Sequence, residues 1–144
     1  MKEDALFKKI LIATDGSEKN RSALDEGLRI ARACGATVYA VYVIDMSAFS
    51  STPGEIPMGD TYRMLEEEGR QVLSRVQSLA GDVSVEMSVL EGRPATEIVE
   101  LAKTKDVDLL VIGTHGKKGL ERLLLGSVAE SVIRSAPCKV LVVK

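Results

Sequence analysis

Four small residues near the C-terminal end have the types and spacing of a phosphate-binding loop: Gly113, Gly116, Gly126 and Ser127. They lie between an apolar run at 108–112 and a helical pattern at 128–133. Glycine lets the backbone approach a ligand closely, and the first N–H groups of a helix lack intrahelical partners and favour anions. A nucleotide's phosphates would suit such a site, but an ordinary turn followed by an N-cap fits the spacing equally well.

A second candidate, Asp15, follows the apolar run at 10–13. A carboxylate at the end of a strand can accept a hydrogen bond from a ribose hydroxyl or bind a cation through oxygen. Capping of the following helix together with Ser17 is an equally good interpretation. The chain has neither a Walker-type loop nor the Gly-x-Gly-x-x-Gly fingerprint of dinucleotide-binding proteins.

The only histidine, His115, stands inside the glycine-containing segment. Its place suggests a phosphate contact, but the sequence shows no acid or nucleophile beside it, so a surface or packing role is favoured over catalysis. Lys117, Lys118 and Arg122 could offset the charge of a triphosphate or form a solvated face. Since paired carboxylates, a His/Cys metal cluster and a nucleophile elbow are all absent from the sequence, binding is better supported than turnover.

Composition places the chain among ordinary globular proteins and predicts one domain over residues 1–144. The net charge is −2 and aromatic residues make up 3%, which gives no general basis for binding nucleic acid or an anionic membrane. The N-terminus lacks the apolar core of a signal peptide, so a cytoplasmic location is expected. In that compartment Cys34 and Cys138 are expected to be buried free thiols.

Hydrophobic periodicity predicts an alternation of strands and helices. Strands are expected at 10–13, 37–44, 83–89, 108–112 and 139–143, and helices at 17–34, 62–79, 94–102 and 128–133. The region 45–60 breaks the pattern and is expected to be either a lid or a disordered loop. The alternation indicates an α/β fold with a parallel sheet and helices on both faces, in which ligands bind at the carboxyl ends of the strands.

The spacing Gly113-x₂-Gly116-x₉-Gly126-Ser127 resembles the ATP-binding signature of the universal stress protein family. The resemblance extends over essentially the whole chain, through the segments 10–17, 41–45, 111–116, 125–129 and 137–143. It implies a Rossmann-like fold, similar to adenine nucleotide α-hydrolases, with strand order 3-2-1-4-5. It also implies a nucleotide-dependent stress-response or regulatory role, with a slow ATPase or another adenine-nucleotide hydrolase as the alternative.

For the site, the resemblance implies that the backbone of Val43 holds adenine, with Thr14 and Asp15 near adenine and ribose. Ala13 stands where many nucleotide-binding members carry proline, and its small side chain leaves room for adenine. Ribose and phosphates would contact the glycine-containing segment, namely Gly113, His115, Gly116, Gly126, Ser127 and Val128. The expected ligand is ATP, or else AMP or ADP, with Mg²⁺ or Mn²⁺ bridging phosphate oxygens and Asp15 and Ser127 as possible metal ligands.

The resemblance further implies a homodimer formed through the last strand, Lys139–Val143. The sequence supports this expectation, because residues 140–143 are all apolar although the implied strand order places them at an edge of the sheet. An uncovered apolar edge strand favours pairing with another chain.

Overall fold

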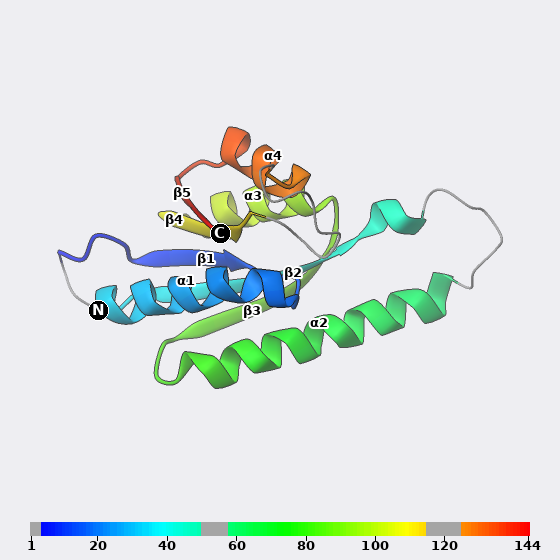
Figure 1. Ribbon diagram of the computed structural model, residues 1–144, viewed down its shortest axis with the longest axis horizontal. Coiled ribbons are helices and arrows are strands. Elements are labelled where there is room, and N and C mark those ends of the chain that lie inside the picture. The colour runs from blue at the N-terminus through cyan, green and yellow to red at the C-terminus, as the bar shows by residue number, and fades with distance from the viewer. Residues whose placement is uncertain (1–3, 50–57, 115–124) are drawn as a thin grey trace.

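The computed structural model describes residues 4–49, 58–114 and 125–144 and contains one five-stranded sheet with the order β3-β2-β1-β4-β5 (Figure 1). All four strand pairs are parallel. The strands are β1 (Lys9–Ala13), β2 (Thr37–Asp45), β3 (Val85–Gly92), β4 (Leu109–Gly113) and β5 (Lys139–Val143). The helices are α1 (Arg21–Cys34), α2 (Met58–Ala80), α3 (Pro94–Thr104) and α4 (Ser127–Ser135). The predicted fold class and strand order are confirmed.

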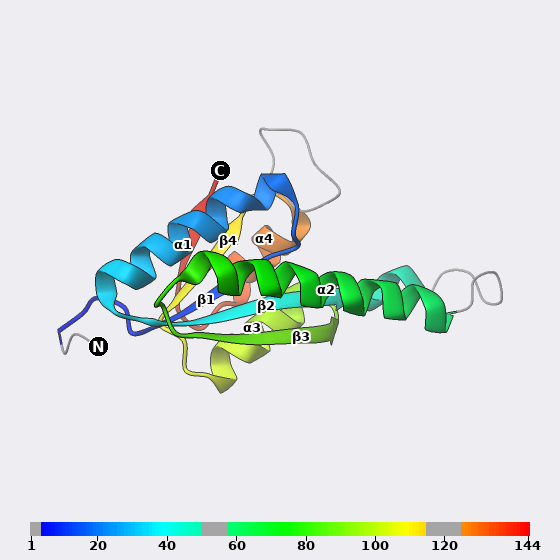
Figure 2. The same ribbon diagram turned by 90° about the horizontal axis from the view of Figure 1, so that it is seen from below.

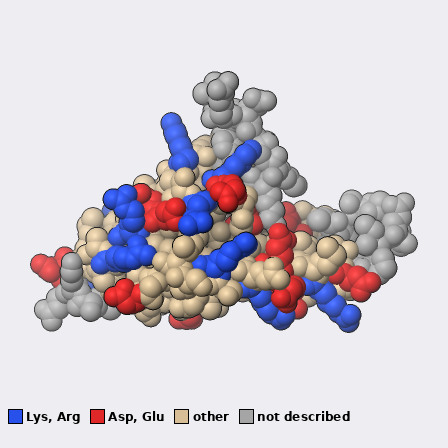
Figure 3. Space-filling model, turned by 60° about the horizontal axis from the view of Figure 1, so that its bottom comes forward, with Lys and Arg blue, Asp and Glu red and all other residues tan. Residues whose placement is uncertain are grey.

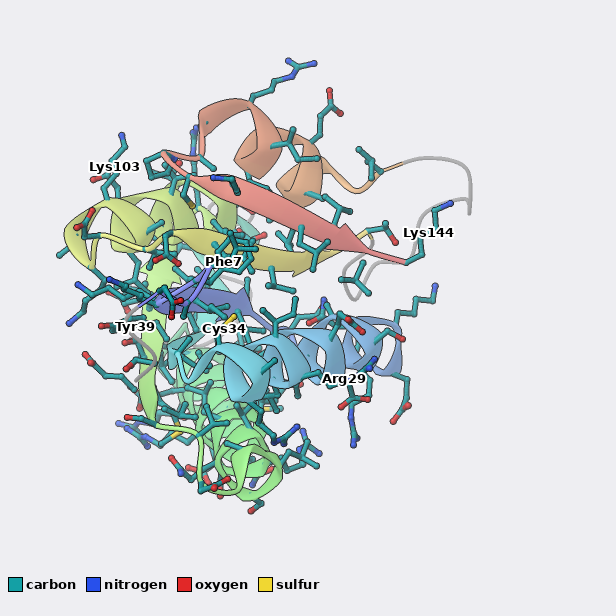
Figure 4. All side chains as sticks on the ribbon, turned by 90° about the vertical axis from the view of Figure 1, so that its left-hand side faces the viewer. Phe7, Arg29, Cys34, Tyr39, Lys103 and Lys144 are labelled. Carbon is teal, nitrogen blue, oxygen red and sulfur yellow. The ribbon has the colours of Figure 1, made fainter. Side chains whose placement is uncertain are left out.

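The helices form two layers, with α1 and α2 on one face of the sheet and α3 and α4 on the other (Figures 2 and 4). Arg29 of α1 and Lys103 of α3 lie on the opposite outer surfaces of these layers (Figure 4). Each layer encloses its own apolar cluster, one around Ile12 and Val111 and the other around Leu11 and Leu110. Strands β1 and β4 are therefore covered on both faces, which explains their continuous apolar sequences.

Helix α1 begins later than the sequence predicts. Ser17, the predicted N-cap, is followed by a short 3₁₀ turn, η1 (Glu18–Asn20), and α1 begins only at Arg21. The hydroxyl of Ser17 donates to Asp15, and the Ser17 side chain accepts no capping bond from the following turn. The predicted end is confirmed, because Gly35 takes the left-handed conformation with φ 67° that closes many helices.

The region 45–60 holds more regular structure than a single loop. Strand β2 continues to Asp45, a 3₁₀ turn, η2 (Met46–Phe49), follows, and α2 already begins at Met58. Residues 50–57 lie outside the described residues, so the choice between a lid and disorder is untested. The N-terminal part of α2 extends past the strands (Figures 1 and 2). In this part of α2 the Tyr62 hydroxyl donates a hydrogen bond to the Glu91 carboxylate. This bond raises the pKa of Tyr62.

Strand β3 lies at a sheet edge, as predicted, but begins at Val85 and continues to Gly92. Apolar and polar residues alternate in this strand, yet Met87 of the apolar series stays 43% exposed. None of the described helices is both long and apolar enough to span a bilayer. Figure 3 shows acidic and basic side chains interspersed over one face of the molecule.

Both cysteines are free thiols, as predicted, although each is half-buried rather than buried. Cys34 packs against the cluster under α1, and Cys138 packs against the cluster on the opposite face of the sheet. The sheet therefore separates the two sulfur atoms. Burial raises the pKa of the Cys138 thiol, and the nearby carboxylate of Asp108 raises it further.

Asp108 fixes the start of β1 against the start of β4. Its carboxylate accepts hydrogen bonds from the backbone N–H of Lys8 at 2.9 Å and of Lys9 at 3.2 Å. In return, the backbone N–H of Asp108 donates to the carbonyl of Lys9 at 2.9 Å. One side chain thus aligns the two central strands at the end of the sheet opposite the candidate site.

We expect Asp108→Ala to lower the free energy of unfolding by about 1–2 kcal/mol, because two backbone donors lose a charged acceptor. Urea titration followed by circular dichroism measures the change. Asp82→Ala is the control, since Asp82 is exposed and makes no hydrogen bond or ion pair to a described residue. Equal stability of the two variants would contradict the role given to Asp108.

Candidate functional site

The candidate site lies at the carboxyl edge of the sheet, where β1 and β4 are neighbours. From β1 the chain crosses to β2 on one side, whereas β4 and β5 lie on the other side. Strand order reverses between β1 and β4, and ligands of open α/β sheets bind at such a switch point. Ala13 ends β1 and Gly113 ends β4, so both residues stand at this edge.

The ladder between β1 and β2 ends at this edge and leaves the backbone of Val43 open. The last bond between the two strands runs from the Thr14 N–H to the Val41 carbonyl, at 3.0 Å. Backbone groups of alternate residues point to the same side of a strand, so the N–H and C=O of Val43 also face β1. Among the described residues they meet no backbone partner there, because β1 has ended. Val43 therefore presents one donor and one acceptor between the two strand ends.

Asp15 forms a tight turn directly after β1. Its Oδ1 accepts hydrogen bonds from the backbone N–H of Ser17 at 2.9 Å and from the Ser17 hydroxyl at 2.6 Å. Its Oδ2 makes no hydrogen bond to a described residue. The turn thus occupies one carboxylate oxygen and leaves the other for a ligand, whereas the predicted capping of the helix by Asp15 and Ser17 is not seen.

The same turn recurs after β2, where sequence reasoning did not anticipate it. Asp45 Oδ1 accepts hydrogen bonds from the backbone N–H of Ser47 at 3.0 Å and from its hydroxyl at 2.7 Å. The available signal was an Asp-x-Ser triplet after each of two buried strands. Two adjacent strand ends therefore carry an acidic turn of the same kind.

The glycine-containing segment is closed at its base by the backbone. The Gly126 N–H donates to the Thr114 carbonyl at 2.7 Å, which brings the start of α4 to the end of β4. The first helical hydrogen bond of α4 runs from Glu130 to Gly126, at 3.0 Å. The N–H groups of residues 127–129 precede that bond and are free of intrahelical partners. His115, Gly116, Lys117, Lys118 and Arg122 lie outside the described residues.

A hollow of about 610 Å³ opens between α3, α4 and the end of β2. Ser127 and Val128 line it from α4, Arg93 and Thr96 from the start of α3, and Asp45 from β2. The positive ends of two helices, Arg93 and Lys103 border this space together with the carboxylates of Asp45 and Glu100, so its lining carries charges of both signs. The sequence predicts a helix start at Pro94, but Arg93 beside it belongs to no recognisable motif.

A smaller hollow of about 260 Å³ lies on the other face of the sheet, between the start of α1 and α2. Thr14, Gly16 and Ser17 line it from one side, and Val72 and Arg75 from the other. The predicted site residues therefore do not line one common hollow. Thr14 borders the smaller hollow, whereas Ser127 borders the larger one. Asp15 lines neither hollow. Within the described part of the chain, no three His, Cys, Asp or Glu side chains gather as a metal cluster.

The protein has a Rossmann-like α/β fold. This follows from its strand order, from the open strand ends and from the start of α4 at the switch point. The sequence profile described as "Universal stress protein family" matches residues 6–144. The chain belongs to this family. A curated relative, universal stress protein MJ0531 from Methanocaldococcus jannaschii, is 49% identical over 141 residues, which cover 96% of this chain and 83% of the relative.

Solved structures agree with this assignment. The structure of the hypothetical protein MJ0577 superposes with a TM-score of 0.85 at 33% identity, and the match covers 96% of each chain. A universal stress protein in complex with cAMP superposes with a TM-score of 0.69 at 27% identity, covering 97% of this chain and 98% of the other.

The turn after β1 is held against α2 through Gly16. Gly16 has φ +80°, and a Cβ added there would lie 2.5 Å from Val72 Cγ2. Both the backbone conformation and the contact therefore require glycine. Any displacement of this part of α2 would act on the turn that carries Asp15.

We expect Gly16→Ala to destabilise the fold by about 2 kcal/mol or more, from left-handed strain and from the contact with Val72. Adding Val72→Ala should relieve the contact, so the double variant should lose about 1 kcal/mol less than the sum of the single variants. Thermal and urea unfolding measure all three. Gly59→Ala is the matched control, because a Cβ there meets nothing within 4 Å. Simple additivity would show that Gly16 does not press on α2.

Proposed function

We propose that the chain binds an adenine nucleotide, ATP in the first place, and acts as a nucleotide-dependent regulatory module rather than a turnover enzyme. The observation that carries the proposal is the open backbone of Val43 at the strand end. A neighbouring N–H and C=O match the acceptor and the amino group on the edge of adenine. The solved relative in complex with cAMP supports this ligand class, since cAMP is an adenine nucleotide.

The phosphates would then extend from β2 across β1 toward the start of α4. There the N–H groups of residues 127–129, which have no intrahelical partners, and the helix dipole favour negative charge. Gly113 and Gly126 flank this path, and Ala13 and Thr14 lie at the end of β1 beside it. For His115 and Gly116 we propose the phosphate contacts that the family resemblance implies.

A divalent cation fits the oxygen chemistry of the same path. The unbonded Oδ2 of Asp15 and the exposed hydroxyl of Ser127 are ligand types that Mg²⁺ and Mn²⁺ accept alongside phosphate oxygens. The ion would neutralise phosphate charge, while Asp15 and Ser127 fix its position. The slow hydrolase remains the alternative, and it would need a general base near the terminal phosphate.

We expect Gly126→Val to abolish ATP binding measured by calorimetry. Gly126 is buried with φ −65° and ψ 156°, a conformation open to any residue, so the added side chain obstructs phosphate approach without straining the backbone. Ile133→Ala, on the exposed side of α4, is the control and should bind as the unmodified protein does. Phosphate release should stay far below the roughly 1–10³ s⁻¹ typical of enzymes.

Mass spectrometry of nucleotide released from freshly purified, denatured protein gives an independent measurement. An unmodified protein that neither carries nor binds ATP, ADP or AMP would refute the proposal. Phosphate release at enzyme rates that is lost in His115→Ala, with binding intact, would favour the hydrolase instead.

We further propose a homodimer formed through the outer edge of β5. The Thr114 N–H donates to the Val143 carbonyl, so Val143 faces β4. By alternation, the backbone groups of Val140 and Val142 point to the free edge. The side chains of residues 140–143 are half-buried in the single chain. A second β5 would pair these groups and cover the strand.

We expect Val142→Pro to convert a dimer to a monomer, because proline removes an outward N–H that β4 does not use. Val142→Ala keeps that N–H and should remain dimeric. Sedimentation velocity distinguishes the two states. A dimeric proline variant, or a monomeric unmodified protein, would contradict pairing through β5.

A further inference from the structure

Helices α1 and α2 leave a hollow between them because they cover different strands of the same face of the sheet. Helix α1 packs mainly on β1 and β4, whereas α2 packs on β2 and β3 (Figure 2). The smaller hollow, of about 260 Å³, lies between the two helices. Arg21, Arg75 and Ser78 border it and are exposed, so the hollow opens to solvent and a solute can enter it.

Contacts between neighbouring elements close both ends of this hollow. At the carboxyl end of the sheet, Val72 packs against Gly16 in the turn that precedes α1. Toward the amino end, the guanidinium of Arg32 on α1 donates to the carbonyl of Leu79 on α2, at 2.8 Å. Val72 and Leu79 are about two helical turns, or roughly 10 Å, apart along α2. The hollow therefore has the length of a small molecule rather than of an extended peptide.

The floor of the hollow is apolar. Leu24 of α1 and Val72 and Val76 of α2 line it, and all three are buried members of the cluster under these helices. Leu79 continues the apolar surface and is half-buried. Pockets for drug-sized ligands measure roughly 300–1,000 Å³, so this smaller hollow suits one aromatic ring or one branched aliphatic chain.

Arg75 gives the rim of the hollow an unmatched positive charge. Arg21, the other cation of the lining, forms an ion pair with Asp25 at 3.0 Å. Arg75 makes no ion pair or hydrogen bond to a described residue, and its side chain is exposed at the rim. A guanidinium pairs with a carboxylate through two parallel hydrogen bonds, which makes the carboxylate the best match for Arg75.

Glu18 limits how much negative charge a ligand can carry. It borders the hollow from η1 and forms no ion pair with a described residue. Its carboxylate repels a second negative charge on a ligand whose first charge is at Arg75. The lining therefore favours a ligand with one negative charge over a dianion or a polyphosphate.

We infer that this hollow binds a small monocarboxylate with a compact apolar body, such as an aryl-substituted or branched-chain alkanoic acid. The carboxylate pairs with Arg75 at the rim, and the apolar body lies on Leu24, Val72 and Val76. Since Gly16 also lines the hollow, the ligand lies against the turn that carries Asp15. The inference does not rest on the proposed function, because the path proposed for the nucleotide runs along the strand ends toward α4.

Two-dimensional NMR of the backbone amides, with phenylpropionate as the probe, tests the inference. Saturable shifts are expected for the signals of Gly16, Val72 and Val76. Phenylpropionamide, which has the same body without the charge, should bind about tenfold more weakly, the lower value for a hydrogen bond to a charged group. Benzylmalonate, which carries two negative charges, should also bind more weakly than phenylpropionate.

Arg75→Gln should weaken phenylpropionate about tenfold and leave the affinity for phenylpropionamide unchanged, because only the charged probe uses the guanidinium. Arg63→Gln is the matched control, since Arg63 is exposed on the same helix and outside the hollow, and it should bind as the unmodified protein does. The charge-specific loss separates pairing at Arg75 from a general change in α2, which would weaken both probes.

Equal affinity of Arg75→Gln and the unmodified protein for phenylpropionate would overturn the inference, as would shifts confined to residues outside the hollow. Displacement of phenylpropionate by MgATP would assign the probe to the nucleotide site and overturn it as well. A protein that binds phenylpropionate in the hollow but no adenine nucleotide would refute the proposed function alone.

Discussion

The end of the β1–β2 ladder is the constraint on which the candidate site depends. Strand β1 forms its last bond to β2 through the Thr14 N–H, while β2 continues to Asp45 beside β3. The unequal strand lengths expose the backbone of Val43 on one side only. Because β4 flanks the short strand on its other side, the start of α4 comes to the same edge. The difference in strand length alone, without any side chain, leaves these backbone groups open at the candidate site.

Much of the fold could be predicted from local sequence. The short apolar runs at 10–13 and 108–112 are buried strands because both faces of the sheet are covered, and Gly35 and Pro94 mark helix boundaries through their own backbone chemistry. The start of α1 could not be predicted. Ser17 is a suitable cap by residue type, yet its side chain is directed to Asp15 and makes no capping bond, and a 3₁₀ turn precedes α1. Residue preferences alone do not reveal that extra turn.

The site was less predictable because its parts depend on long-range packing. The backbone of Val43 is open because a different strand, β1, ends beside it, and this is not visible in the residues around Val43. Arg93 likewise gains meaning only when the starts of α3 and α4 border one hollow. The family resemblance indicates Val43 as an adenine contact only by analogy. The end of the β1–β2 ladder gives a physical reason why its backbone groups are open to a ligand.

The hydrogen bond between Gly126 and Thr114 also joins two parts of the chain that are separate in sequence. It holds the residue that follows β4 beside the residue that precedes α4, with 2.7 Å between the two backbone atoms. Both atoms belong to the main chain, so a change of the side chain at residue 114 removes neither the donor nor the acceptor. The position of the start of α4 at the end of β4 is therefore set by the backbone itself.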